Sequence, residues 1–270
     1  MESVLEAPVH PPRRGDQDAR PRVLVPREHG AYGQLLFPLA VAHLTARPSA
    51  AGWLFTVVAI ATFIGHEPWL VLLGRRGARA ARELGARARR VLALCTAVAV
   101  AAMIAGLFAA SPAGRQGLLL PALLAPLIAV FVVRNAERTL AGELLVGATL
   151  PAFALPIALA GDVEPARALA TWAVWTLSSA AAIGSVRSVI AHLKRPANSV
   201  QRAAMPLAVL GIAGALSMLH LLDAKAVVAL VPTLEVSAVA SLLAPHPRHL
   251  KSIGWALVAA SVITAVLLCL

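Results

Sequence analysis

The feature that most constrains this chain is a series of long apolar blocks, separated by short connections that hold Gly, Pro or charged residues. Each block is close to the ~20 residues that an α-helix needs to cross the hydrocarbon core of a bilayer. With 59% hydrophobic and 14% charged residues, a soluble domain would lack the polar side chains to cover its surface. The alternating segments of ~10 residues that mark a β-barrel are absent from the sequence. The pattern predicts an all-α, polytopic transmembrane bundle.

About nine spans can be assigned, within a transmembrane domain that covers residues 27–270. The preceding residues, 1–26, are rich in Pro, Arg and Asp and contain no apolar stretch typical of a signal peptide, so we expect a disordered cytoplasmic tail. The predicted spans are residues 30–46, 51–73, 91–110, 117–133, 140–160, 168–191, 203–222, 224–244 and 252–270.

The positive charges predict how the chain is oriented. With the N-terminus inside, twenty of the 24 Lys and Arg residues fall on the inner side of the nine-span layout, and four fall outside. This asymmetry is the one that sets orientation in membrane proteins. We therefore expect a multi-pass protein of the cell (plasma) membrane, with a cytoplasmic N-terminus and an outer C-terminus. The net charge of +11 then reflects orientation, so we expect membrane lipids as partners and no nucleic acid.

The segment HEPWLVLLGRR, at the end of the second predicted span, holds the first candidate residues. Ionisable residues inside spans are costly and are candidates for function. His66 and Glu67 form an acid–imidazole pair that can bind a cation or transfer a proton. No second His follows four residues on, so the segment is not an HExxH zinc motif. The alternative is an ion pair between Glu67 and an arginine, with a structural role.

The segment RNAERTLAGELL, which joins the fourth and fifth predicted spans, is the second candidate. Arg134, Asn135 and Arg138 supply hydrogen-bond donors, and Glu137 and Glu143 supply acceptors. Arginine is suited to bidentate recognition of phosphate. The alternative is a solvated loop stabilised by salt bridges.

The third candidate segment, GSVRSVIAHLKRP, ends the sixth predicted span and carries a basic strip of Arg187, His192 and Arg195. An anionic headgroup or a diphosphate would fit this strip, although the orientation charges explain part of it. The opening PREHGAYGQ brings further polar residues to the inner mouth of the first span. These residues are Arg27, Glu28 and His29. All these groups lie toward the inner side, so we expect one polar cavity that faces the cytoplasm.

Two family resemblances rest on these segments. PREHGAYGQLLFPLA together with HEPWLVLLGRRGARA resembles the YwiC-like family of bacterial integral membrane proteins, a family without an established activity. More distantly, GQLLFPLA, RNAERTLAGELLVGATL and the nine-span layout are similar to the UbiA prenyltransferase superfamily. That superfamily carries two aspartate-rich motifs that bind Mg²⁺, and this chain has HEPWLVLLGRRG and SVRSVIAHLKRP at the matching places, without an aspartate. The resemblance therefore implies a UbiA-like bundle without the usual magnesium site, and we expect no metal and no other cofactor.

Three functional hypotheses follow. In the first, the cavity binds an anionic isoprenoid or lipid-like ligand, as a degenerate prenyltransferase-like protein would. His66, Glu67 and His192 would be its acid or base groups if it is an enzyme. In the second, the chain is a proton-coupled transporter of a small solute, which would use embedded acids such as Glu143 and Glu235. In the third, it is a non-catalytic membrane scaffold.

Overall fold

The computed structural model describes residues 24–25, 29–194 and 198–270, and the described residues are helical without any strand. The predicted all-α transmembrane bundle is thereby confirmed. The helices are α1 (His29–Thr45), α2 (Ala50–Leu72), α3 (Ala78–Ala109), α4 (Pro112–Gly117), α5 (Leu119–Val133), α6 (Leu140–Ala152), α7 (Ala154–Ala160), α8 (Pro165–Lys194), α9 (Ser199–Met218), α10 (Ala224–Leu243) and α11 (Leu250–Cys269), with a 3-10 turn, η1 (Pro247–His249), before α11.

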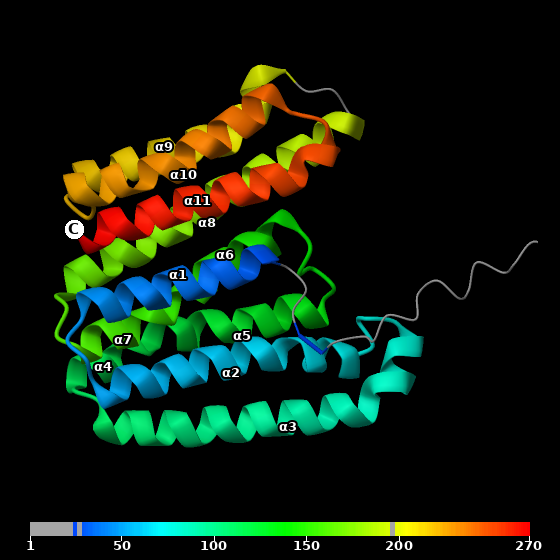
Figure 1. Ribbon diagram of the computed structural model, residues 1–270, viewed down its shortest axis with the longest axis vertical. Coiled ribbons are helices and arrows are strands. Elements are labelled where there is room, and N and C mark those ends of the chain that lie inside the picture. Colours follow the sequence, from blue (N-terminus) through cyan, green and yellow to red (C-terminus); the bar gives the residue numbers. More distant parts are fainter. Residues whose placement is uncertain (1–23, 26–28, 195–197) are drawn as a thin grey trace, which may run out of the picture.

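Within the described residues, eight helical segments are long and apolar enough to cross a membrane. They are α2, α3, α4 with α5, α6 with α7, α8, α9, α10 and α11. The first predicted span, α1, has 17 residues, which is ~25 Å at 1.5 Å per residue and shorter than the ~30 Å hydrocarbon core. It nevertheless lies inside the bundle, where Leu35 and Leu39 are buried. Figure 1 shows all of these helices running nearly parallel or antiparallel to one another.

Two of the predicted spans are interrupted, and both interruptions fall three residues before a proline. One lies at Leu118, before Pro121, and separates α4 from α5; the other lies at Phe153, before Pro156, and separates α6 from α7. Proline has no N–H to donate to the carbonyl four residues back and its ring crowds that carbonyl. A change of direction inside the membrane is therefore built into both spans.

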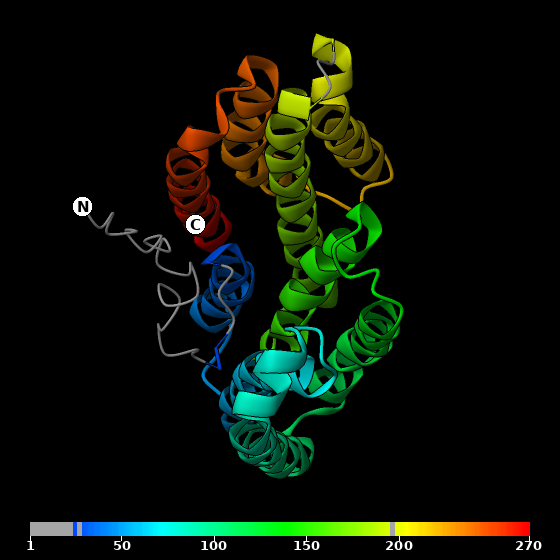
Figure 2. The ribbon, with the colours of Figure 1, turned by 90° about the vertical axis from the view of Figure 1, so that its right-hand side faces the viewer.

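Two groups of buried residues form the core, and α8, the long helix at the centre of Figure 2, contributes residues to both. One group comes mainly from α1, α2, α6 and α7 and surrounds Phe55 and Ile157. The other comes mainly from α8, α10 and α11 and surrounds Trp175 and Leu230. Leu24, at the end of the expected tail, is buried against Val71 and Ala88; residues 1–23 and 26–28 lie outside the described part of the chain.

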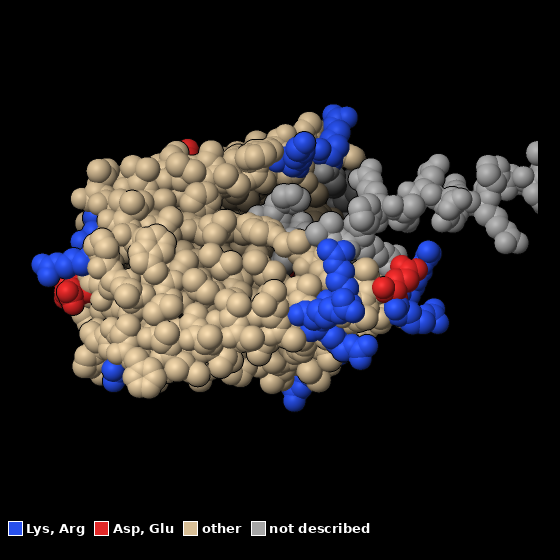
Figure 3. Space-filling view, turned by 60° about the horizontal axis from the view of Figure 1, so that its bottom comes forward, with Lys and Arg blue, Asp and Glu red and all other residues tan. Residues whose placement is uncertain are grey.

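Charged residues gather at the two ends of the bundle, with a broad and almost uncharged band between them (Figure 3). We call the end that holds the α2–α3, α5–α6, α8–α9 and α10–α11 connections the basic end. Five arginines between Arg79 and Arg90 lie in the first turns of α3 at this end. The opposite end carries Arg47, Arg115, Arg167 and Lys225.

Gly117 supplies the first testable prediction, because α4 packs closely on α7. A Cβ atom at Gly117 would lie 2.7 Å from the Cα of Pro156, and backbone atoms cannot move aside. Gly117→Ala should therefore lower the free energy of unfolding by about 1–3 kcal/mol. Gly211 is the control, since a Cβ there meets nothing within 4 Å, and alanine favours helix. Thermal unfolding in detergent measures both variants, and equal midpoints would contradict the close packing of α4 on α7.

Candidate ligand cavity

A cavity of about 460 Å³ opens between α2, α3, α5 and α6. It runs from the basic end to the middle of the bundle, because its lining begins at the helix ends around Arg76 and Arg138 and reaches Ala59 and Phe153. α2 packs along α3, and α5 packs against α6, whereas the cavity lies between α3 and α5. Pockets for small organic ligands typically enclose about 300–1,000 Å³, so this space is large enough for a ligand.

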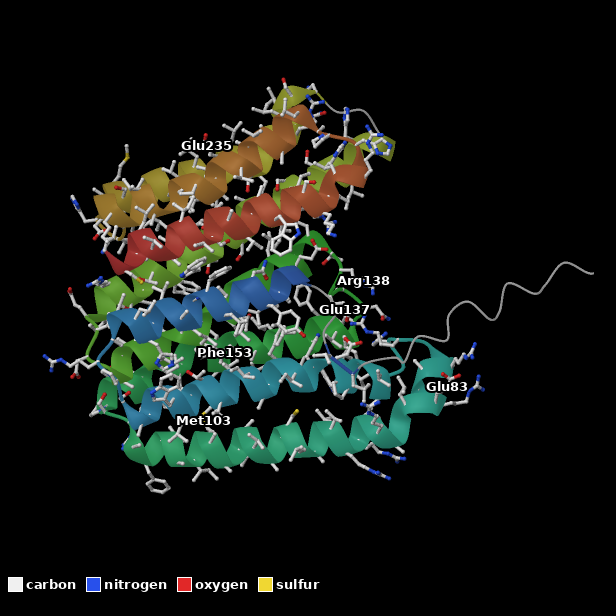
Figure 4. The ribbon with its side chains drawn as sticks, in the orientation of Figure 1. Glu83, Met103, Glu137, Arg138, Phe153 and Glu235 are labelled. Carbon is white, nitrogen blue, oxygen red and sulfur yellow. The ribbon has the colours of Figure 1, made fainter. Side chains whose placement is uncertain are left out.

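The inner part of the cavity is apolar. Its wall includes Phe63 of α2, Leu92 of α3, Ile128 of α5 and Leu150 of α6. Phe153, at the break between α6 and α7, closes the inner end and lies well inside the bundle in Figure 4. The helix break therefore shapes the cavity as well as the backbone. This wall suits a hydrocarbon chain.

The mouth of the cavity is polar and begins with an ion pair. The Arg76 guanidinium donates from Nε to Oε1 of Glu67 at 2.8 Å and from Nη2 to Oε2 at 2.5 Å. Glu67 is 5% exposed, so a bidentate partner offsets the cost of burying its charge. The partner comes from the connection that follows the same helix, and both residues line the cavity. His66 lines the cavity beside them and its ring lies 5.9 Å from that of Trp69.

The α2–α3 and α5–α6 connections are tied together at the same end. Arg75 donates from Nη1 to Oδ1 of Asn135 and from Nη2 to the carbonyl oxygen of Val133 at 2.6 Å. Asn135 has a φ of 55°, and asparagine is one of the few residues that adopt this left-handed conformation readily. Asn135 therefore has a structural role: it forms the turn that ends α5 and accepts a hydrogen bond from Arg75.

A second ion pair brings α8 to the cavity. Nη1 of Arg187 lies 2.9 Å from Oε2 of Glu143 and also donates to the carbonyl oxygen of Arg138 at 3.3 Å. Glu143 lines the cavity. Two candidate residues that are 44 positions apart in the sequence therefore belong to one cluster, and the charge of Arg187 is already balanced by Glu143.

Glu137 and Arg138 complete the mouth and differ from the residues around them. Both line the cavity, and Figure 4 shows them side by side at the basic end. Within the described part of the chain, neither side chain forms an ion pair. Oε2 of Glu137 is buried and accepts no hydrogen bond from the described residues. An unpaired acid and an unpaired base thus face the same space.

The other predicted site residues lie away from the cavity or outside the described residues. Arg27, Glu28 and Arg195 are outside, and His29 is the first residue of α1. Arg134 is exposed at the end of α5, and His192 lies near the end of α8. Neither is among the residues that line the cavity.

Sequence reasoning did not single out Arg76 as a site residue, although it named Glu137 as an acceptor in the second candidate segment. It treated Arg76 as an orientation charge, although its position after HEPW was a signal that it could reach Glu67. Glu235, by contrast, is exposed on α10, far from the cavity (Figure 4). Among the described residues, no group of three or more His, Cys, Asp or Glu converges; the expectation of a metal-free protein stays a prediction.

The sequence model of the family described as YwiC-like protein matches residues 25–159, half of the chain. The chain belongs to the YwiC-like family. No curated protein and no solved structure matches it. The matched segment covers α1 to α7 and therefore every residue that lines the cavity, from Ala31 to Phe153. The similarity to UbiA prenyltransferases stays a prediction.

The Glu67–Arg76 pair supplies the second testable prediction. Glu67→Gln leaves the Arg76 guanidinium without its charged partner at a half-buried position, so the free energy of unfolding should fall by about 1–3 kcal/mol. The control is Glu83→Gln, which breaks the exposed Arg79–Glu83 pair within α3 and should cost no more than ~0.5 kcal/mol. Denaturant titration in detergent compares them, and equal losses would show that burial does not strengthen the Glu67 pair.

Proposed function

We propose that the protein binds an amphiphile in this cavity, with an anionic headgroup at the basic end and an apolar chain between α3 and α5. The observation that carries the proposal is the division of the cavity into an apolar interior and a mouth where Arg138 has no partner among the described residues. An arginine at the rim of an apolar space is suited to a phosphate on a lipid-like or isoprenoid chain.

The helices on either side of the cavity favour access from the lipid. Much of the surface of α3 and α5 is exposed and apolar, as at Leu94, Val100, Leu123 and Leu127. Such a surface faces hydrocarbon in a membrane protein. A chain that enters between α3 and α5 exchanges one apolar environment for another, while its headgroup stays at the polar level of the basic end.

The proposal includes an orientation in the membrane. The basic end carries the α2–α3 arginines and the ends of α5 and α8, so the positive-inside rule places it at the cytoplasmic face of a bacterial inner membrane. The headgroup would then bind at the cytoplasmic side. His66 and Glu67 stand at the same mouth and are the acid and base groups for any chemistry on the headgroup.

Proton-coupled transport is less well supported. His66, Glu67 and Glu143 do line the cavity, but beyond Phe153 the bundle is filled by the packed core around Phe55 and Ile157. A solute would have to pass through that core to reach the opposite end. Glu235 is exposed on the outward face of α10 and does not lie on such a path.

Binding to the purified protein tests the proposal. The probes are dilauroyl phosphatidic acid and farnesyl phosphate, measured by native mass spectrometry and thermal-shift titration. Arg138→Ala should weaken binding about tenfold or more, because a charge-assisted hydrogen bond contributes ~1.5–3 kcal/mol. Arg248→Ala, an exposed arginine at the same end in η1, is the matched control and should leave the affinity unchanged. Failure of both probes to bind would leave the scaffold hypothesis.

A further inference from the structure

We infer that the anionic phosphate of the headgroup stands beside a primary amine, so that the headgroup as a whole is zwitterionic; this rests on the proposed function and adds the amine to it. The charges at the mouth divide into pairs and a remainder. Glu67 is held by Arg76 and Glu143 by Arg187. The remainder consists of Glu137 and Arg138, one acid and one base, both lining the cavity.

A purely anionic headgroup would be complementary to Arg138 but not to Glu137. Its phosphate would be attracted to Arg138, but it would stand close to the carboxylate of Glu137 and be repelled by it. A headgroup that carries both charges satisfies both side chains: the phosphate accepts from Arg138, and the ammonium donates to Glu137. Both side chains line the same cavity, so one headgroup can meet both of them.

The buried oxygen of Glu137 selects the kind of amine. Oε2 accepts no hydrogen bond from the described residues, and a buried acceptor without a donor is costly. A primary ammonium has three N–H donors, and the Glu137 side chain lines the cavity, so a turn of its carboxyl group brings this oxygen to one of them. A quaternary ammonium such as choline has none. The cavity should therefore prefer an ethanolamine-type headgroup to a choline headgroup of the same net charge.

Three lipids with the same acyl chains test this inference: dilauroyl phosphatidylethanolamine, phosphatidylcholine and phosphatidic acid. The wild type should bind phosphatidylethanolamine about tenfold more tightly than the other two. Glu137→Gln should remove this preference without weakening phosphatidic acid, whereas Arg138→Ala should weaken all three. Free phosphoethanolamine is a fourth probe; if it binds with the same dependence on Glu137, the zwitterion is supported and its source is a soluble compound.

The outcomes separate the inference from the proposed function. If the wild type binds phosphatidic acid as tightly as phosphatidylethanolamine, or if Glu137→Gln leaves the ratio unchanged, the zwitterionic headgroup is wrong while amphiphile binding stands. If no lipid binds and Arg138→Ala therefore changes nothing, the proposed function itself is wrong.

An independent observation concerns Glu235. It lies in the middle of α10, its side chain is exposed, and it has no hydrogen bond or ion pair within the described part of the chain. The same face of α10 exposes Val228, Val231, Val239 and Leu242. This face looks outward from the bundle, as Figure 4 shows for Glu235. In a monomer, lipid hydrocarbon would therefore surround Glu235.

We propose that a second copy of the chain covers this face. A carboxyl group in hydrocarbon is costly without a partner, and the cations of α9 and α10, Arg202 and Lys225, lie at helix ends rather than at this depth. Around a two-fold axis along the membrane normal, residues near the axis meet their own copies. The two copies of Glu235 then face one another across the interface and are shielded from hydrocarbon.

Cysteine cross-linking in native membranes tests this interface, in a background with Cys95 and Cys269 replaced by alanine. Val231→Cys and Val239→Cys should each form a disulfide-linked dimer, because each meets its own copy one turn from Glu235. Val262→Cys, equally exposed on α11, is the control and should stay monomeric. Glu235→Gln should retain the dimer, since two amides also pair, and Glu235→Leu should weaken it. Equal cross-linking at Val262, or an unaffected dimer with Glu235→Leu, would overturn the proposal.

Discussion

Arginine side chains at the basic end link the parts of the chain that surround the cavity mouth. Arg76 returns to Glu67 at the end of its own helix, Arg75 reaches the α5–α6 connection, and Arg187 reaches Glu143 from α8. Glu67 would be costly to bury alone, and its pair with Arg76 offsets that cost with two directed hydrogen bonds. Among the described residues, the Arg187–Glu143 pair is the ion pair that joins α8 to a helix lining the cavity.

The cavity itself depends on the way a bilayer restricts the backbone. Spanning segments must satisfy their own hydrogen bonds and are therefore helical, so irregular backbone is tolerated only where protein or a cavity surrounds it. The break at Phe153 meets this condition, since the residues that follow it, Leu155 and Ile157, are buried in the core. A straight helix from Leu140 to Ala160 would not place Phe153 at a bend that closes the inner end of the cavity.

The spans could be predicted from the sequence because the free energy of crossing a membrane is largely a sum over local residues. The contacts of the charged side chains could not, because they depend on which helices become neighbours. Glu143 and Arg187 were both expected at the inner side, but their pairing across 44 residues has no sequence signal. Glu235 was grouped with the cavity acids because its depth is readable from the sequence, whereas the face it occupies depends on how α10 packs against α8.

The two halves of the chain, α1 to α7 and α8 to α11, contribute differently to the cavity. The family match and the cavity lining both end before α8, so α1 to α7 contain the whole of the space in which a ligand would lie. The second core, around Trp175 and Leu230, belongs mainly to α8, α10 and α11. Arg187 joins the two through Glu143, and it does so at the cavity mouth. By neutralising Glu143 from outside the cavity wall, α8 leaves Glu137 and Arg138 as the unpaired charges there, and so the second half of the chain sets the charge that a headgroup meets.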